Sequence, residues 1–203
     1  KIPKVPQFYH INGSVAASSA ATDGEQVCFY FDDYGLVTTD LNGDLLWEHK
    51  FAISTSNLFS YGASPIIDAG KVLLNRDGAI DSCLMCFDIK TGREVWKAKR
   101  PNAINSYCSP YILKTKTGKE VLQGGSGELV AYDSQTGKEV WSERIGGNYS
   151  ASPIYADGRL YFFSEEGKTT VIKASPNFKK LAENKLASGF MASPAVHGNS
   201  LIL

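Results

Sequence analysis

Methionine, tryptophan and histidine are scarce in this sequence of 203 residues, which has two Met, three Trp and three His. No run of about eighteen apolar residues occurs, so we expect no membrane-spanning helix. Net charge is also lacking, because 21 basic residues balance 21 acidic ones. This neutrality does not suggest binding to nucleic acid or to an anionic membrane. The densest basic run, residues 97–100, is explained equally well by a solvated strand edge.

A sustained helical period is absent as well, and the longest candidate segments are interrupted by Gly or Pro. What the sequence does contain is 19 Gly, 10 Tyr and 10 Phe. This composition favours many short strands joined by turns. We therefore predict an all-β fold.

Two independent markers repeat along the chain. Ser-Pro occurs at residues 64–65, 109–110, 152–153 and 193–194, with proline spacings of 45, 43 and 41. Ser19 lies 45 residues before Ser64 and takes the same place. The three tryptophans, Trp47, Trp96 and Trp141, are spaced by 49 and 45 residues. A shared period of this length is typical of four-stranded propeller blades.

Each repeat has the same internal order. An apolar run follows Ser-Pro, then come a turn, a second and a third apolar run, and a last run that carries the Trp. Four short strands joined by tight turns make one antiparallel blade, and several blades around an axis make a β-propeller.

The turn before the Trp strand is the most specific part of the repeat. It begins at Asp133 and Asp88 in two repeats, where Asp-x-x-Thr-Gly-x-x-x-Trp is complete, and at Asp40 in a shorter form with Asn42-Gly43. Asp accepts hydrogen bonds from turn amides, and Gly tolerates the positive φ of a tight hairpin. The Trp offers a large flat face for packing between blades.

The pattern Ala-x-Asp-x-x-Thr-Gly-x-x-x-Trp at residues 131–141 resembles the tryptophan-docking motif of pyrroloquinoline-quinone-like (PQQ-like) propeller repeats. The resemblance implies that Trp47, Trp96 and Trp141 dock against neighbouring blades. Cys86 replaces the Ala in one repeat, and residues 173–179 of the fourth repeat have neither Thr-Gly nor Trp. The docking geometry of that fourth blade is therefore left open.

Residues 18–25, 161–169 and 181–186 resemble, more narrowly, a bacterial branch called BamB-like, linked to outer-membrane biogenesis. This resemblance implies a non-catalytic propeller scaffold that binds proteins or ligands of the cell envelope, in the periplasm. From the residues themselves we expect no cofactor, no metal, no catalytic residue and no nucleic-acid partner. The protein partner stays unidentified.

We predict a single propeller domain over residues 1–203, with blades near 19–61, 62–106, 107–149 and 150–190 and a partial blade at 191–203. That makes about four and a half blades. Rings of this family commonly have eight blades, which need roughly 350 residues at this period. We therefore expect the chain to be a piece of a larger ring.

Four cysteines invite a metal or redox interpretation, above all the Cys83-x-x-Cys86 pair. The repeat favours a packing role instead. Cys86 aligns with Ala131, and Cys108 aligns with alanines just before other Ser-Pro pairs. Residues three apart on a flat strand also point to opposite faces. We expect Cys28, Cys83, Cys86 and Cys108 to be buried and unpaired, with a metal or disulfide role as the alternative.

His10, His49 and His197 have no Ser or Cys nucleophile at motif spacing. We interpret all three as solvent-facing turn residues, with a catalytic triad as the alternative. Asn148-Tyr149-Ser150 matches an Asn-x-Ser glycosylation pattern, but a loop entering a first strand explains it better in a bacterial-type chain.

The resemblance leaves two further functions open. One is a quinone-dependent alcohol or sugar dehydrogenase, which would carry an adjacent Cys-Cys pair and calcium-binding carboxylates. No Cys-Cys dipeptide is present, and Asp40, Asp88 and Asp133 are explained by their turns. The other is a sensor propeller fused to a kinase or a membrane anchor.

Overall fold

The computed structural model describes residues 16–32, 34–51, 62–78, 81–104, 106–116 and 118–203. Every regular element in these ranges is a β-strand. The strands form four four-stranded antiparallel sheets and one two-stranded hairpin, each a simple meander. The predicted all-β fold with four-stranded antiparallel blades is confirmed.

The blades follow one another along the chain. Blade 1 comprises β1 Ala21–Thr22, β2 Gln26–Phe31, β3 Gly35–Asp40 and β4 Leu45–Lys50. Blade 2 comprises β5 Ile66–Asp68, β6 Lys71–Arg76, β7 Cys83–Asp88 and β8 Glu94–Lys99. Blade 3 comprises β9 Tyr111–Thr115, β10 Gly118–Gly125, β11 Glu128–Asp133 and β12 Glu139–Arg144. Blade 4 comprises β13 Ile154–Ala156, β14 Arg159–Phe163, β15 Lys168–Lys173 and β16 Lys180–Lys185, and the hairpin β17 Ala195–His197 with β18 Ser200–Ile202 follows.

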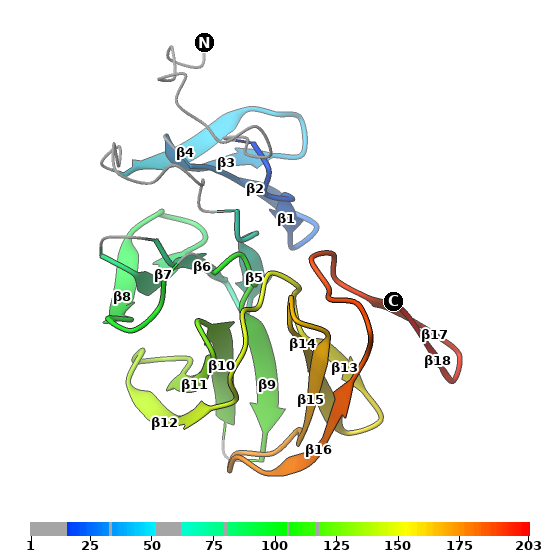
Figure 1. Ribbon diagram of the computed structural model, residues 1–203. Coiled ribbons are helices and arrows are strands. Elements are labelled where there is room, and N and C mark those ends of the chain that lie inside the picture. Colours follow the sequence, from blue (N-terminus) through cyan, green and yellow to red (C-terminus); the bar gives the residue numbers. More distant parts are fainter. Residues whose placement is uncertain (1–15, 33, 52–61, 79–80, 105, 117) are drawn as a thin grey trace.

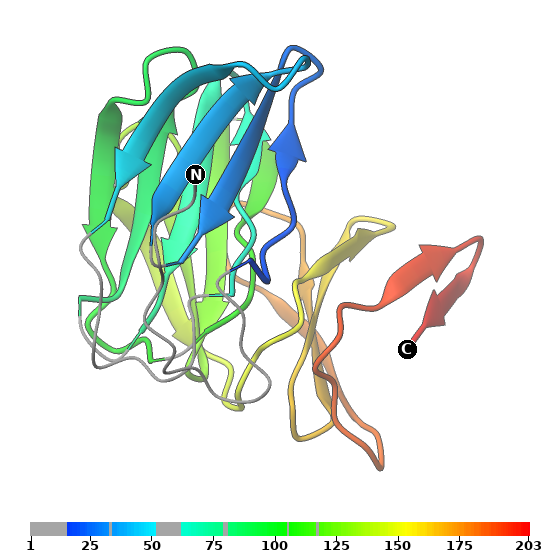
Figure 2. The same ribbon diagram turned by 90° about the horizontal axis from the view of Figure 1, so that it is seen from above.

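The blades are arranged as an arc. The first strands β1, β5, β9 and β13 lie on its inner side, and the fourth strands β4, β8, β12 and β16 lie on its outer rim (Figure 1). The β17–β18 hairpin projects at one end (Figure 2). Because every blade is a meander, all turns between strands one and two and between three and four share one side, here called the turn face. The opposite side, here called the loop face, carries the second turns and the connections between blades.

Position within a blade determines how a strand is buried. The middle strand β7 is buried at five of its six positions, since its sheet is covered on both faces. The outer strand β8 is buried only at Trp96 and Ala98, on the face toward blade 3. In blade 2, an apolar run therefore marks the middle strand, and alternation marks the outer strand.

The hydrophobic core consists of the layers between blades. One cluster joins Tyr30 of β2 to Leu74 and Met85 of blade 2, and a second joins Leu73 of β6 to Val121 of β10. A third layer joins blade 3 to blade 4. Burial of these apolar faces holds consecutive blades together.

The three tryptophans occupy equivalent positions. Trp47, Trp96 and Trp141 pair with Thr38, Cys86 and Ala131, just before a bulge between the third and fourth strands of each blade. Blade 4 has the same bulge, with Ala182 at the Trp position.

Each indole reaches the next blade along the chain. Trp47 Nε1 donates to Ile89 O at 2.6 Å, and Trp96 Nε1 donates to Ser134 O at 3.2 Å. The indoles lie against Gly92 and Gly137, both at φ +68, where an added Cβ would come within 2.5 Å of Cε3. Glycine is thus required there both by the turn and by the ring above it.

The serines of the Ser-Pro pairs link the inner strands of consecutive blades. The hydroxyl oxygen of each accepts a hydrogen bond from the backbone amide of the equivalent serine one blade earlier. The four distances lie between 2.8 and 3.2 Å, for Ser19 to Ser64, Ser64 to Ser109, Ser109 to Ser152 and Ser152 to Ser193. The recurring serine therefore satisfies a backbone amide of the preceding blade. We call each such contact between the inner strands of consecutive blades an inner seam.

Candidate functional site

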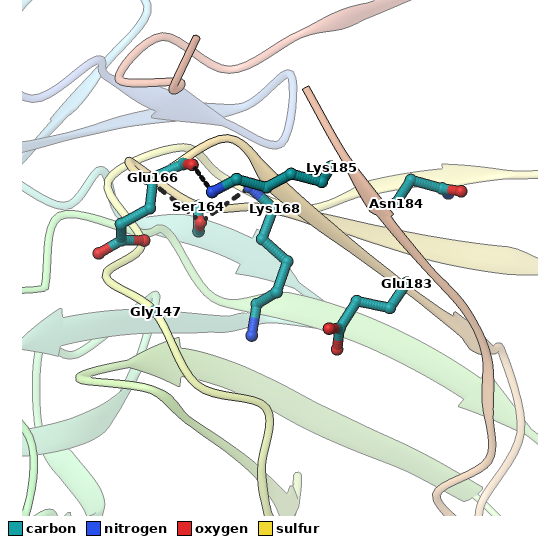
Figure 3. Close-up of a pocket in the computed structure, with 7 residues that line it drawn as sticks. All are labelled: Gly147, Ser164, Glu166, Lys168, Glu183, Asn184 and Lys185. Atoms are coloured by element: carbon teal, nitrogen blue, oxygen red, sulfur yellow. Dashed lines mark hydrogen bonds between the residues drawn. The ribbon is translucent and has the colours of Figure 1, made fainter. Parts of the chain in front are cut away.

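Blade 4 carries a polar hollow of about 430 Å³ on the loop face (Figure 3). Its lining comes from three segments: Gly147 in the connection after β12, Ser164 to Lys168 around the β14–β15 turn, and Glu183 to Lys185 on β16. The antiparallel register places Lys168 directly opposite Lys185. The end of the outer strand is thereby brought against the connection from blade 3.

Hydrogen bonds fix the wall of this hollow. The Glu166 carboxylate accepts from the Asn148 amide at 3.1 and 3.2 Å. Lys168 Nζ donates to Ile145 O, and Lys185 Nζ donates to Glu166 O. Burial acts to raise the pKa of Glu166, but the Ser164 hydroxyl and the Asn148 amide outweigh it and leave that pKa below its usual value. Glu166 is consequently a carboxylate at neutral pH.

Gly147 is required where the connection passes this turn. Its φ is +89, and an added Cβ would lie 2.9 Å from Glu166 Oε2 and 3.0 Å from Ser164 Cβ. A side chain there would push the two segments apart and break the contact between the Asn148 amide and Glu166.

Two further hollows occupy equivalent places on the loop face. One of about 370 Å³ lies between the β10–β11 turn of blade 3 and the connection to blade 4, and it shares Gly147 and Glu166 with the first. The other, of about 330 Å³, lies between Ser82 and Ile104 at the end of β8 in blade 2. Ile104 is 60% exposed, and the Ser126 hydroxyl bonds both its amide and its carbonyl. The loop face therefore presents a row of polar, open recesses.

A buried ion pair anchors the connection between blades 2 and 3. Arg100 Nε donates to Asp77 Oδ1 at 2.9 Å, and its Nη1 donates to Tyr132 OH at 3.0 Å. Both partners of the pair are at most 4% exposed. Burial raises the pKa of Asp77, and the Arg100 guanidinium opposes that rise. Such a pair is costly to break, so it holds the loop in one position.

The turn aspartates are used by their turns, as predicted. Asp88 Oδ1 accepts from the Thr91 amide at 2.8 Å and from the Thr91 hydroxyl at 2.7 Å. Asp133 repeats this with Thr136, at 2.8 and 2.7 Å. The threonine hydroxyls and turn amides hold the pKa of both carboxyls below its usual value. Together with Asp40 of blade 1, these aspartates are distributed over three blades.

The cysteines are buried and unpaired, as predicted. Cys83 lies in the layer toward blade 1 and Cys86 in the layer toward blade 3, so they point to opposite faces. Burial raises the pKa of Cys28 to about 11 and that of Cys86 and Cys108 to about 12, which keeps these thiols neutral. Within the described ranges, no group of three His, Cys, Asp or Glu side chains converges as a metal site requires.

The prediction for His49 was wrong. It lies within β4, and its ring packs against two aromatic rings. The distance between ring centroids is 4.8 Å to Phe87 of blade 2 and 5.1 Å to Phe51. Burial lowers the pKa of His49. Since the covering ring comes from the next blade, the local sequence could not show this. His197 is exposed at the end of β17, and His10 lies outside the described residues.

The Asn148 segment forms the connection that leads into β13, as expected, with Tyr149 buried against Phe162. The hollows and the ion pair were not found from the sequence. Their one signal was the basic run at residues 97–100, which contributes Lys97, Lys99 and Arg100 to the blade 2 hollow. No helix suited to crossing a membrane occurs in the portion of the chain that the structure describes.

Known proteins similar to this chain support the architecture. A family model described as outer membrane protein assembly factor BamB matches residues 10–110 and 54–203. The assembly factor BamB of Marinobacter adhaerens is 24% identical over 94 residues, covering 46% of this chain and 23% of that protein. A 1-butanol dehydrogenase (quinone) of Thauera butanivorans is 30% identical over 118 residues, covering 50% of this chain and 18% of that protein.

The crystal structure of BamB from Moraxella catarrhalis superimposes with a TM-score of 0.73 at 18% identity, covering 95% of this chain and 59% of that one. At this identity the likeness shows the fold. The chain spans less than two thirds of the length of each of these three proteins. Because the family model matches nearly the whole sequence, this chain belongs to the BamB family of PQQ-like β-propellers.

Proposed function

We propose that this chain is part of a non-catalytic propeller scaffold that binds other proteins of the bacterial cell envelope, in the periplasm, through its loop face. The observation that carries the proposal is the match to the BamB family over residues 10–203. The three open polar hollows support the choice of face, since open recesses with polar walls suit contacts with another protein surface.

The tryptophans have a structural part in this proposal. Trp47, Trp96 and Trp141 serve as the docking residues of the PQQ-like repeat, each fixing its blade to the next. Blades fixed in this way present their loops at constant spacing. A preorganised surface binds with a smaller entropic penalty than a flexible one.

Site-specific photo-crosslinking in living cells tests the proposal. The full-length protein would carry a photoreactive amino acid at Ile104 or Glu165 on the loop face, or at Lys90 or Gln135 on the turn face as matched controls. We expect adducts with a component of the outer-membrane protein assembly machinery from the loop-face positions only. Equal adducts from both faces, or none with that machinery, would contradict the proposal.

A quinone-dependent alcohol dehydrogenase is the second candidate, favoured by the 30% identity to the 1-butanol dehydrogenase (quinone). The same full-length protein, supplied with pyrroloquinoline quinone and calcium, would be assayed for alcohol-dependent dye reduction. Turnover that requires both additions would place this candidate first.

A further inference from the structure

Each blade ends its outer strand with a cation. These residues are each paired with the first residue of the third strand, in the same register in all four blades: Lys50, Lys99, Arg144 and Lys185. They stand three positions after the tryptophans, or after Ala182 in blade 4. We call them the rim cations. The fourth strands follow the outside of the arc, so the rim cations follow the outer edge of the loop face (Figure 1).

Three of the rim cations line the hollows described above. Lys99 borders the hollow of blade 2, Arg144 that of blade 3 and Lys185 that of blade 4. Lys99 and Arg144 are exposed, and neither forms an ion pair with any residue that the structure describes. Lys50, by contrast, pairs with Glu48 at 2.9 Å. The two central blades therefore each hold an exposed cation without an ion pair beside an open recess.

The turn face offers an internal comparison. Arg93 and Lys138 lie three residues before Trp96 and Trp141, at the opposite end of the same blades. Arg93 helps to lower the pKa of the neighbouring Asp88, so its charge is partly used by the turn. Glu128 stands opposite Arg144 in the strand register, but neither Lys99 nor Arg144 forms an ion pair with a residue that the structure describes.

We infer that the rim cations, with Lys99 and Arg144 at their centre, bind an acidic, extended segment of a partner protein that runs across consecutive blades. The inference deepens the proposed function and rests on it. Exposed cations without an ion pair, repeated on consecutive blades, are complementary to carboxylates spaced along a chain. The exposed Ile104, beside Lys99 in the same hollow, adds an apolar contact.

A polypeptide fits this surface better than an anionic membrane. Each hollow also has a carboxylate: Glu166 and Glu183 line that of Lys185, and Asp81 lines that of Lys99. Glu166 lines the hollow of Arg144 as well. A flat anionic surface would meet these carboxylates together with the cations. A peptide can place its own carboxylates at Lys99 and Arg144 and pass Glu166 with a neutral residue.

Fluorescence anisotropy with a labelled poly-L-glutamate of thirty residues tests the charge complementarity on the full-length protein. The test variant is Lys99→Glu with Arg144→Glu. The matched control is Arg93→Glu with Lys138→Glu, which makes the same charge change at the turns that precede the same strands, on the turn face. We expect the test variant to weaken binding by about tenfold or more and the control by less than about threefold. Circular dichroism melting of both variants establishes that they are folded.

Equal weakening by the two variants would overturn the inference, because binding would then follow net charge alone. Binding to phosphatidylglycerol vesicles would be measured with the same variants. If vesicle binding requires Lys99 and Arg144 and poly-L-glutamate binding does not, the inference is overturned in favour of a membrane. If poly-L-glutamate binding is unchanged and the test variant aggregates more, the inference is also overturned. The rim cations would then serve to prevent aggregation at an exposed sheet edge.

The photo-crosslinking at Ile104, repeated with the Lys99→Glu and Arg144→Glu variant, separates this inference from the proposed function. Wild-type adducts that disappear in this variant and persist in the turn-face control support both. Adducts that persist in both variants contradict the inference and leave the proposed function intact. Absence of wild-type adducts contradicts the proposed function itself.

Discussion

The seam between blades 2 and 3 and the seam between blades 3 and 4 use the same indole contact on different partners. Trp96 lies over Gly137 of a complete Thr-Gly turn and is 8% exposed. Trp141 meets a turn without Thr-Gly, where its Nε1 donates to Pro176 O at 2.8 Å and its ring contacts Phe178 at 5.5 Å.

Blade 4 thus receives the indole of blade 3 without a Thr-Gly turn. The acceptor in both seams is a backbone carbonyl, which any residue supplies. The glycine platform can therefore be replaced by another apolar surface, provided that the turn still presents its carbonyl to the indole. The residue types of the Thr-Gly motif specify the turn. Docking of the indole requires only a backbone carbonyl oxygen and a flat apolar surface in the right positions.

Removing the indole at the blade 2–3 seam should have the largest effect. We expect Trp96→Ala to lower the free energy of unfolding by about 3–5 kcal/mol, since a buried aromatic side chain is lost. Urea denaturation measures it. Val95→Ala, at an exposed neighbouring position of the same strand, should change stability by less than about 0.5 kcal/mol. Equal losses in the two variants would show that the indole is not the element that holds the seam.

Substitution of Gly137, the glycine under the Trp96 ring, should have the second largest effect on stability. Gly137→Ala adds a Cβ within 2.5 Å of the Trp96 ring at φ +68, and we expect a loss of about 2–4 kcal/mol from backbone strain and overpacking. Gly43→Ala, at the same turn position of blade 1, meets nothing within 4 Å and should lose only the backbone share of about 1–2 kcal/mol. Similar losses in thermal melts would contradict the contact between indole and glycine.

Phe178, which takes the place of the glycine under the indole at the blade 3–4 seam, should be energetically coupled to Trp141. In a double-mutant cycle of Trp141→Ala and Phe178→Ala, we expect an interaction energy of about 0.5–1.5 kcal/mol, typical of a packed aromatic pair. A cycle of Trp96→Ala with Phe178→Ala serves as the control, because these residues belong to different seams. Coupling near zero at Trp141 would mean that Pro176 O alone holds the indole.

The inner seams should lose about 1 kcal/mol when a serine hydroxyl is removed. Ser109→Ala leaves the Ser64 amide without its acceptor at 3.1 Å. Hydrogen exchange should show faster exchange at Ser64 in this variant and unchanged exchange at the Ser19 amide, which bonds to Ser64. Unchanged exchange at Ser64 would contradict a capping role for the Ser-Pro serine.

The smallest effect should be a pH dependence confined to the blade 1–2 seam. His49 stands two residues after Trp47, where Ala98 stands after Trp96. Because the folded state lowers the pKa of His49, the unfolded chain binds more protons, and stability is lost as the pH falls through about 6.5. We expect the melting temperature of His49→Gln to change less between pH 8 and pH 5.5 than that of the wild type. Parallel curves would show that the imidazole does not titrate differently on folding.

The sequence by itself determined the all-β repeat and the four blades' inner organisation. Ser-Pro spacing, the Trp spacing and the Asp-led turns are local patterns, and each fixes the conformation of a few consecutive residues. Their shared period was sufficient to predict four-stranded antiparallel blades and to explain Asp40, Asp88, Asp133 and the buried cysteines without a metal.

Only the tertiary structure decided what lies between blades. Phe87 covers His49, Arg100 meets Asp77, and Pro176 receives Trp141, and each contact joins residues more than twenty positions apart. No local pattern records such contacts, because burial and pairing depend on which side chains the neighbouring blade brings. The rim cations show the same division. Their spacing from the tryptophans can be read from the sequence, but the hollows beside Arg144 and Lys185 form only where blade 4 packs against the connection from blade 3.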